Sequence, residues 1–525
     1  MPLAPIVRRS SADLLVRIAI AAGAGAVGGV AFPPRTWPLL LVASVAVLLA
    51  LLIRESAPRA GLIGLAFGLG WFGVVVHWAQ VVGTDGWVVL ALVCAVFIAV
   101  MAAGIALVQR MPLAPLWVAA VWVLQESARS SIPFGGFPWG RVADGAGPGL
   151  SRQLSFGGFS FVTFSLVLIA ATVVLAVDSQ IGSAGPDTTT GRPAMVLVLV
   201  LATVLVLPLV FSSAGRTTTT GSIRVAVVQG DVPGEGLDFL GRKRAVLQNH
   251  VRVTQELADA VASGKVSRPD VVVWPENSTD IDPILDREAR GLIQKAVDAI
   301  KVPILLGTVL ESNDPTRVRN AAVLWEPGKE PQVVYVKQRP VPFGEYLPFR
   351  SVIGPLVSRF DRVPRDFEAG TSTGVVQVGG ATLGLAICFE VAHDDIQRAS
   401  VQDGADLLVV LTNNATYSLT DQPDQQFSIT RQRSIELGRA TVVAATTGIS
   451  AVVGSDGQAQ ARLPVREPGY LVEDVDLTGG TTLAVRAGQG IETGLAIVGL
   501  LAVIVAAATR RRRPERATAQ RQEQV

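Results

Sequence analysis

Hydrophobic positions follow two different patterns along the chain, and the pattern changes near residue 221. Long apolar stretches crowd the first 212 residues, and one more stands alone near the C-terminus. About 20 apolar residues in a helix cross a hydrocarbon core roughly 30 Å thick, so these stretches predict membrane spans. The candidate spans are Ala12–Phe32, Pro38–Ile53, Ala60–Val82, Trp87–Val108, Leu113–Leu124, Phe156–Val177, Ala194–Phe211 and Ile491–Ala508.

After Gly221, short runs rich in Val, Leu and Ile alternate with polar segments of helical period. Near-continuous apolar strands are typical of strands buried on both faces, so we predict a layered α/β domain. Close spacing predicts an antiparallel pair within Ala321–Val336. The expected strands are Ile223–Val228, Val271–Val273, Ile304–Val309, Ala321–Leu324, Val333–Val336, Val375–Val378, Leu383–Ile387, Leu407–Leu411, Val442–Ala445 and Ser450–Val453. The expected helices are Lys243–Ala262, Ile284–Ile300 and Gln425–Gly438.

The chain therefore divides into a membrane domain of seven spans (1–220), an α/β domain (221–489) and a final span with a basic tail (490–525). Composition agrees, because 50% of the 525 residues are hydrophobic and only 17% are charged, against roughly 25% in soluble proteins. The net charge of +2 argues against a nucleic-acid partner. Two cysteines and three histidines are too few and scattered for a disulfide framework or a zinc site, so we expect no metal or cofactor.

Charge is distributed unevenly, and its distribution predicts the orientation of the chain in the membrane. Segment Ser222–Gln489 has 27 Lys and Arg against 33 Asp and Glu, whereas the remainder has 18 against 10. Arginines flank alternate ends of the spans: Arg8, Arg9, Arg17, Arg54, Arg59, Arg110, Arg192, Arg510–Arg513, Arg516 and Arg521. Since cytoplasmic loops carry an excess of positive residues, we expect both termini in the cytoplasm. The α/β domain then lies on the outer side of the cytoplasmic membrane.

The loop Ser131–Gly158 is rich in Gly and Pro and carries Phe134, Phe137 and Trp139. Irregular backbone at membrane depth must be buried in protein or lie at the interface. Aromatic residues are common at such interfaces. The loop is therefore either an interfacial segment or a lid or docking surface for a lipid.

Three reactive side chains follow predicted strands, where ligands gather in α/β sheets. Glu276 follows Val271–Val273, Lys337 follows Val333–Val336, and Cys388 follows Leu383–Ile387. A thiolate is a strong nucleophile, a carboxylate can take its proton, and an ammonium can stabilise an oxyanion. Together they indicate acyl transfer through a thioester.

Each of the three also has a structural interpretation: a buried small hydrophobe for Cys388, a helix cap for Glu276 and a surface charge for Lys337. Cys94 lies inside an apolar span, so we expect it to be structural.

Several motifs carry a resemblance to a known family. W-P-E at Trp274–Glu276, Y-x-K at Tyr335–Lys337, V-P-F-G-E-Y-x-P at Val341–Pro348 and I-C-F-E at Ile387–Glu390 resemble the nitrilase superfamily. With the spans, the F-P-W-G loop, Val227–Gly230 and Thr446–Ala451, the whole chain is similar to the apolipoprotein N-acyltransferase family, the integral-membrane branch.

The resemblance implies a nitrilase-like α-β-β-α sandwich outside the bacterial cytoplasmic membrane. It also implies transfer of an acyl chain from a phospholipid, through a cysteine thioester, to the N-terminal amine of diacylglyceryl apolipoproteins. In this chain Glu276 would be the base, Lys337 the oxyanion stabiliser and Cys388 the nucleophile. Glu345 would orient the site and Glu390 would support it. We expect a monomer.

The chain departs from the family pattern at aromatic positions. Phe389 stands where the family often has Tyr, so the ring is kept without its hydroxyl. Phe239 is the aromatic residue after Gln229-Gly230-Asp231, and Thr416-Tyr417 ends the N-N-A-T-Y stretch. With Trp139, Phe239 and Tyr417 are candidate substrate contacts.

These departures concern acceptor handling or rate, and they leave alternatives to the acyltransferase. One is a paralogue with an altered acceptor, and another is a membrane-tethered nitrilase-like amidase or hydrolase in which water resolves the thioester. A non-catalytic lipid-binding scaffold is the third. The eight spans favour lipid substrates, since a soluble amide needs only one anchor.

Overall fold

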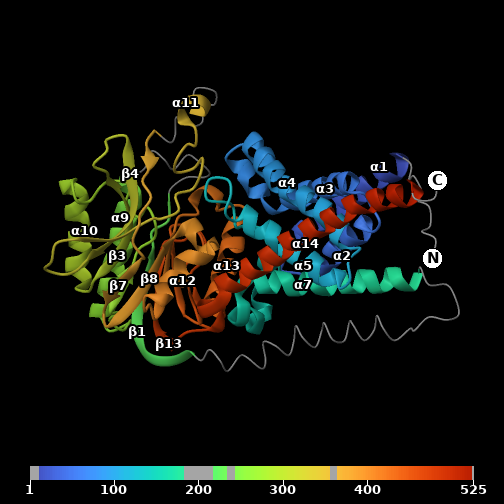
Figure 1. Ribbon diagram of the computed structural model, residues 1–525. Coiled ribbons are helices and arrows are strands. Elements are labelled where there is room, and N and C mark those ends of the chain that lie inside the picture. The colour runs from blue at the N-terminus through green and yellow to red at the C-terminus, as the bar shows by residue number, and fades with distance from the viewer. Residues whose placement is uncertain (1–10, 182–216, 233–242, 355–363, 523–525) are drawn as a thin grey trace.

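A helical body and an α/β body lie end to end in the computed structural model, which describes residues 11–181, 217–232, 243–354 and 364–522 (Figure 1). The final helix leaves the α/β body and runs back along the helical one. The helices of the helical body are α1 (Ser11–Val30), α2 (Pro38–Leu52), α3 (Ala57–Val75), α4 (Thr84–Val108), α5 (Ala114–Arg129), α6 (Val142–Ala146), α7 (Ser151–Ile181) and α14 (Leu483–Gln522).

Five helices in the described residues are long and apolar enough to cross a membrane. They are α1, α3, α4, Arg152–Ser179 of α7 and Leu483–Arg510 of α14. Helices α2 and α5, with 15 and 16 residues, are shorter than the roughly 20 residues that a perpendicular span needs. Seven of the eight predicted spans are thus helical, and the eighth, Ala194–Phe211, lies outside the described residues.

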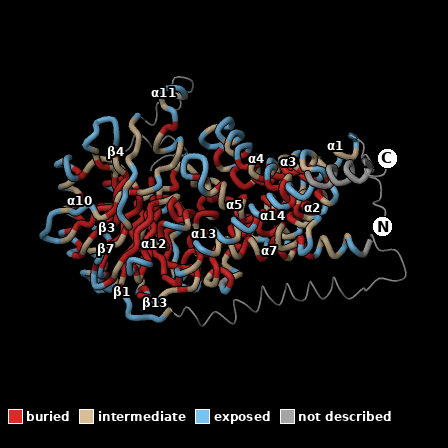
Figure 2. The backbone as a smooth tube through the Cα atoms, in the orientation of Figure 1, coloured by how far each residue is buried: buried red, intermediate tan, exposed pale blue. Residues whose placement is uncertain are grey.

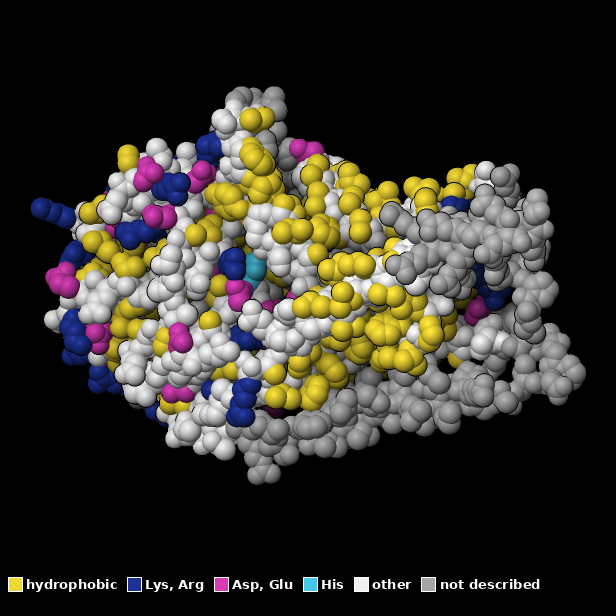
Figure 3. All heavy atoms as spheres, in the orientation of Figure 1, with side chains coloured by type: hydrophobic (Ala, Val, Ile, Leu, Met, Phe, Trp, Pro, Cys, Tyr) yellow, Lys and Arg dark blue, Asp and Glu magenta, His cyan; other side chains and the backbone are white. Residues whose placement is uncertain are grey.

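Small residues let the first helices pack closely. A Cβ on Gly25 of α1 would lie 2.0 Å from the Phe67 carbonyl oxygen of α3, and one on Gly70 of α3 would lie 2.1 Å from the Ala22 carbonyl oxygen. In lipid, where no hydrophobic effect drives helices together, such close backbone contact is the main source of packing energy. On the face shown in Figure 3, apolar side chains gather on the helical body, whereas charged side chains are scattered over the α/β body.

Two predicted segments differ from what the structure shows. The span predicted over Ala60–Val82 ends at Val75, and a separate 3-10 turn follows over His77–Val81. The loop Ser131–Gly158 is irregular only in its first part, since it contains α6, the turn η2 (Gly147–Leu150) and the start of α7. Helix α7 breaks at Gly158, whose φ of 72° suits glycine.

The α/β body is built from two sheets. The seven-stranded sheet has the order β13-β1-β2-β3-β4-β5, with β6 paired to β4, and the six-stranded sheet has the order β12-β11-β10-β9-β8-β7. Strands of the first are β1 (Thr217–Gln229), β2 (Val271–Val273), β3 (Ile304–Glu311), β4 (Arg317–Trp325), β5 (Gln332–Val336), β6 (Asp366–Phe367) and β13 (Gly469–Gly480). Strands of the second are β7 (Val375–Val378), β8 (Ala381–Ile387), β9 (Leu407–Thr412), β10 (Thr441–Ala445), β11 (Ala451–Val453) and β12 (Ala459–Arg462).

The sheets pack face to face between helices, which confirms the predicted α-β-β-α sandwich. Alternation along β1 explains the layering: Val225 and Val227 join the core between the sheets, whereas Ala226 and Val228 join the core under the outer helices. Helices α9 (Lys243–Ala262) and α10 (Arg287–Ile300) cover the first sheet, and α12 (Asp394–Gln402) and α13 (Gln422–Leu437) cover the second.

In the α/β body, the sequence predicted most of the apolar strands but missed β6, β12, β13, α12 and the short helix α11 (Arg350–Ile353). The largest omission is β13, which pairs antiparallel with β1 from Gly469 to Gly480. Charged residues interrupt it at Glu473, Asp474 and Asp476, so it lacks the apolar run that marks a buried strand. The predicted antiparallel pair within Ala321–Val336 is confirmed as β4 and β5.

The two bodies share one continuous core. Val410 of β9 and Val443 of β10 belong to the same buried cluster as the membrane helices. Buried backbone runs without interruption across the junction around α13 (Figure 2). Helix α13 is buried along nearly all its length although it is polar, so its side chains need partners in both bodies. The turn that begins at Cys388, directly after β8, packs against α13 at this junction.

Candidate active site

The ends of three strands from both sheets bring Glu276, Lys337 and Cys388 together. Glu276 follows β2, Lys337 follows β5, and Cys388 follows β8 across the sandwich. Lys337 Nζ lies 3.2 Å from Glu276 Oε1, and both side chains are almost fully buried. Cys388, which is half-buried, is close enough for both charges to act on its thiol.

Glu276 is held by groups from three other segments. Its Oε1 accepts hydrogen bonds from Lys337 Nζ and from Asn320 Nδ2 at 2.8 Å. Its Oε2 accepts one from the backbone N–H of Asn413 at 2.8 Å. The next helix, α10, begins only at Arg287, so Glu276 caps no helix. Both oxygens are instead bonded to Lys337, Asn320 and the Asn413 N–H.

Glu345 forms the other wall around the lysine. Its Oε1 accepts from Lys337 Nζ at 2.9 Å and from Asn320 Nδ2 at 2.8 Å, while its Oε2 accepts from the Val341 N–H at 2.7 Å. Asn320 therefore bridges the two carboxylates. No local pattern in the sequence marks Asn320, because it follows Arg319 just before the apolar run Ala321–Trp325 and its partners come from other segments.

Lys337 remains an ammonium despite its burial. Burial lowers the pKa of Lys337, but the carboxylates of Glu276 and Glu345 outweigh it and raise the pKa well above the ordinary value. Only 1% of the side chain is exposed, so Lys337 is not a surface charge. A fixed cation thus acts electrostatically on the thiol of Cys388.

Cys388 has a left-handed backbone conformation, with a φ of 55°. Such a conformation costs free energy for a residue other than glycine and persists only where the surroundings enforce it. Buried Glu390 supplies that constraint: its Oε2 accepts from the Ile387 N–H at 2.7 Å, and its Oε1 accepts from the N–H groups of Gln338 (2.7 Å) and Arg339 (3.0 Å). Glu390 thereby ties the turn η6 (Cys388–Ala392) to the segment after Lys337.

The thiol is protonated in the resting site. Burial raises the pKa of Cys388 to about 12, the Glu276 carboxylate adds to this effect, and the Lys337 ammonium opposes it. Because only the thiolate is a good nucleophile, a neighbouring group must take the proton during the reaction.

Phe389, next to the thiol, lies between two aromatic rings of the helical body. Its ring stacks on Phe137 (centroids 5.9 Å apart, planes at 19°) and on Trp139 (6.1 Å, 18°). A ring without a hydroxyl satisfies this stacking, which explains how Phe occupies the position. Trp139 is itself buried and donates from Nε1 to Gln425 Oε1 at 2.7 Å.

The remaining predicted contacts have different outcomes. Tyr417 meets Trp78 edge to face with centroids 5.2 Å apart, and burial raises its pKa to about 12. Phe239 lies outside the described residues. Trp78 and Gln425, which complete this cluster, were not identified from the sequence because their neighbours come from distant segments.

A cavity of about 370 Å³ adjoins this cluster. Both bodies line it. Phe134, Gly135 and Gly136 come from the helical body, Phe389 comes from the turn that begins at Cys388, and His393 directly follows that turn. Apolar, polar and basic residues complete the wall: Arg317, Gln338, Arg339, Pro340, Pro342, Tyr346, Phe367 and Ala369. Among the described residues, no group of three or more His, Cys, Asp or Glu side chains could hold a metal ion.

Comparisons with known proteins agree with both bodies. Residues 24–172 match the family model of the apolipoprotein N-acyltransferase N-terminal domain, and residues 224–484 match that of carbon-nitrogen hydrolases. An apolipoprotein N-acyltransferase of Mycolicibacterium smegmatis is 36% identical, covering 94% of this chain and 86% of its own. One from Photobacterium profundum is 28% identical, covering 89% and 90%. A solved amidase from Nesterenkonia sp. aligns with 52% of this chain and 95% of its own, at 18% identity and a TM-score of 0.34.

The raised pKa of Cys388 predicts that its rate of alkylation increases with pH. In Glu276→Gln on a Cys94→Ala background, alkylation by iodoacetamide should increase about tenfold per pH unit from pH 7 to 9, because only free thiolate reacts. The substitution removes one cause of the raised pKa of Cys388, but burial, the larger cause, remains, so no plateau should occur below pH 9. The wild-type carboxylate should flatten this dependence by accepting the proton. A plateau below pH 9 in Glu276→Gln would contradict the assigned environment of the thiol.

Proposed function

This chain belongs to the apolipoprotein N-acyltransferase family, and from that premise we propose that it transfers a fatty acyl chain from a membrane phospholipid to the N-terminal amine of diacylglyceryl apolipoproteins. The acyl chain passes through a thioester on Cys388. The observation that carries this proposal is the buried ammonium of Lys337, held between Glu276 and Glu345 beside the thiol.

In the first half-reaction, Glu276 takes the proton of Cys388 and the thiolate attacks the ester carbonyl of the phospholipid. Negative charge develops on the carbonyl oxygen, where the Lys337 ammonium stabilises it. The C–O bond then breaks, and the leaving alkoxide receives the proton from Glu276. The products are a lysophospholipid and the acylated cysteine.

In the second half-reaction, the amine of the acceptor attacks the thioester carbonyl, and Lys337 again stabilises the oxyanion. Glu276 accepts a proton from the attacking nitrogen, the C–S bond breaks, and the proton passes to the departing sulfur. The products are an amide and free Cys388. Glu345 orients Lys337 and Asn320 in both steps through its hydrogen bonds, and Glu390 holds the turn that carries the nucleophile.

The aromatic stack supports a lipid substrate over a soluble amide. Phe137 and Trp139 of the helical body pack directly on Phe389, so the nucleophile lies where the membrane helices meet the sandwich. The cavity of about 370 Å³ at this place combines apolar rings with Arg317 and Arg339. Those two chemical types suit an acyl ester attached to a phosphodiester head group.

The proposed function predicts an acyl-enzyme. Protein incubated with radiolabelled phospholipid and no acceptor should form an adduct on Cys388 that hydroxylamine releases, because thioesters are cleaved by this reagent. Cys388→Ala should form none, whereas Cys94→Ala should be labelled normally, since Cys94 is buried in α4. Adding a diacylglyceryl lipopeptide should move the label to its N-terminus. Release as free fatty acid instead would identify a hydrolase.

If Lys337 stabilises the oxyanion, replacing it should lower the rate of acylation. Lys337→Met should slow single-turnover acylation by ~10²–10³-fold, because the cation acts mainly on the transition state. Lys337→Arg should not restore the rate, since a planar guanidinium does not replace a compact ammonium.

Removing the lysine alone leaves the Glu276 and Glu345 carboxylates buried side by side, which can destabilise the fold. A second variant therefore separates the loss of the cation from a loss of stability. Lys337→Met with Glu345→Gln removes one charge of each sign and should recover thermal stability while remaining slow. A normal rate in either folded variant would exclude Lys337 as the oxyanion partner.

We also propose that the α/β body lies on the outer side of the bacterial cytoplasmic membrane, with both termini in the cytoplasm. Single cysteines on a Cys94→Ala, Cys388→Ala background test this. Glu330→Cys, at a side chain that is 83% exposed in the α/β body, should react with a membrane-impermeant maleimide in intact cells. Arg54→Cys, at a 66% exposed side chain between α2 and α3, should react only after permeabilisation. The reverse result would invert the topology.

A further inference from the structure

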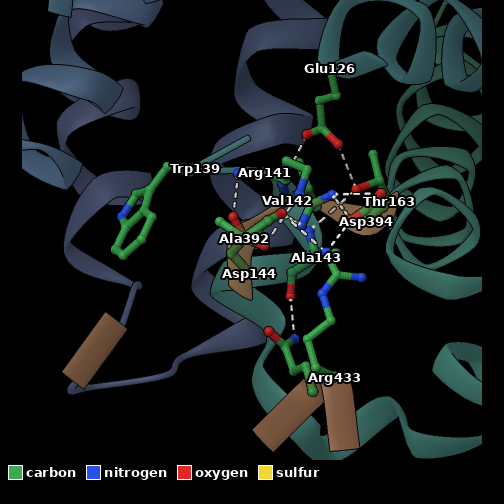
Figure 4. A network of polar contacts seen from close by, with 12 residues as sticks. Glu126, Trp139, Arg141, Val142, Ala143, Asp144, Thr163, Ala392, Asp394 and Arg433 are labelled. Carbon is green, nitrogen blue, oxygen red and sulfur yellow. Dashed lines mark hydrogen bonds and ion pairs between the residues drawn. The ribbon is translucent and has the colours of Figure 1, made fainter. Parts of the chain in front are cut away.

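The helical body contacts the nucleophile turn through a second, ionic connection beyond the aromatic stack. It begins at Arg141, immediately after the F-P-W-G loop, and ends at the residues that follow Cys388 (Figure 4). Every side chain in this network is largely buried, although it carries several charges. Buried charges are retained only where each has partners, so the geometry of the network is closely determined.

Arg141 crosses the junction between the two bodies. Its NH1 donates to both carboxylate oxygens of Asp394, at 2.9 and 3.0 Å, and its NH2 donates to the carbonyl oxygen of Ala392 at 3.4 Å. Ala392 is the last residue of the turn that Cys388 begins. One side chain of the helical body thus fixes the far end of the nucleophile turn.

The helical body holds Arg141 equally firmly from behind. Its backbone N–H donates to Asp144 Oδ2 at 2.9 Å, and its Nε lies 3.4 Å from Asp144 Oδ1. The next N–H, of Val142, donates to Glu126 Oε1 at 2.9 Å, and Glu126 Oε2 accepts from Thr163 Oγ1 at 2.8 Å. Helices α5 and α7 therefore set the position of the guanidinium.

Arg433 of α13 completes the connection from within the α/β body. It donates from Nε to the carbonyl oxygen of Val391 and from NH2 to that of Ala392, both at 3.0 Å, and it also pairs with Asp394. Phe159 of α7 lies between the two guanidiniums, which are 4.3 and 4.2 Å from its ring centroid. Asp394 consequently has a pKa well below the ordinary value, because Arg141 and Arg433 outweigh the effect of burial.

The turn of five residues is thus fixed at both ends and at its centre. Glu390 ties its start to the segment after Lys337, the rings of Phe137 and Trp139 hold Phe389, and Arg141 with Arg433 holds its end. The strained backbone of Cys388 needs such constraints, since relaxation of φ from 55° would swing the thiol away from its neighbours.

We propose that Arg141 is a positioning residue for the acyl transfer: through Asp394 and the Ala392 carbonyl, it lets the membrane domain set the position of Cys388. The role rests on the proposed chemistry at Cys388, because it concerns the rate of that step. A sub-ångström shift of the nucleophile relative to Lys337 and Glu276 reduces the rate without changing how phospholipid is bound.

The experiment is single-turnover acylation of the full-length protein in detergent micelles, with labelled phosphatidylethanolamine varied to saturation. Arg141→Gln should lower the rate at saturation by ~10²-fold per folded molecule and leave the half-saturating lipid concentration within twofold of wild type. Arg141→Lys, which keeps the charge but loses the two-nitrogen fork, should fall between Arg141→Gln and wild type.

Arg439→Gln is the matched control. Arg439 is also buried and donates to three backbone carbonyl oxygens, those of Ala405 (2.8 Å), Gly438 (3.2 Å) and Gly480 (2.6 Å), none of which lies in the nucleophile turn. Arg439→Gln should lose about as much thermal stability as Arg141→Gln, while its folded fraction acylates at the wild-type rate. It therefore shows the result expected of a substitution that affects stability alone.

The outcomes separate the two proposals. If wild type acylates and folded Arg141→Gln acylates equally fast, Arg141 is structural and the positioning role is wrong. If Arg141→Gln raises only the half-saturating concentration, Arg141 binds lipid instead, which also overturns it. If wild-type Cys388 forms no adduct at all, the proposed function itself fails, irrespective of Arg141.

Discussion

Burial of the Lys337 ammonium between two carboxylates is the constraint on which the site depends. An unpaired charge of this kind is unstable away from water, so Glu276 and Glu345 must both approach it, at 3.2 and 2.9 Å. The two carboxylates repel each other, and the Asn320 amide that bridges them reduces this cost. These contacts connect the segment after β2, strand β4 and the segment after β5 at one end of the sheet. The thiol is placed against this assembly by the other sheet.

Buried polar groups that need partners also connect the sandwich to the membrane helices. Helix α13 is polar yet buried, and three of its side chains contact the helical body. Gln425 accepts from Trp139 Nε1, Gln432 donates to the Ala143 carbonyl oxygen, and the Arg433 guanidinium lies 4.2 Å from the centroid of the Phe159 ring. A flat apolar interface would allow the bodies to slide, whereas directional hydrogen bonds and ion pairs specify one arrangement. The nucleophile turn lies within this interface, so the chemistry of the α/β body depends on the helices that bring it to lipid.

Aromatic residues explain how the chain accommodates its departures from the family pattern. Phe389 lies between Phe137 and Trp139, and stacking needs the ring and not a hydroxyl. Tyr417, at the end of the N-N-A-T-Y stretch, packs on Trp78 of the helical body. The rings thus form one cluster around the residue next to Cys388, drawn from three distant parts of the sequence.

The sequence alone predicted seven helices of the helical body, most buried strands and the three strand ends that carry Glu276, Lys337 and Cys388. These features are local, because burial on both faces and bilayer thickness select apolar residues over a short window. The tertiary structure decided what depends on distant partners. Strand β13 is charged and becomes a strand only because β1 offers it a hydrogen-bonding edge. No local pattern marks Asn320 or Arg141. Asn320 matters because Glu276 and Glu345 meet around it, and Arg141 matters because it reaches the residues after the nucleophile turn. Pairing of buried charge is a non-local property, and no window of sequence records it.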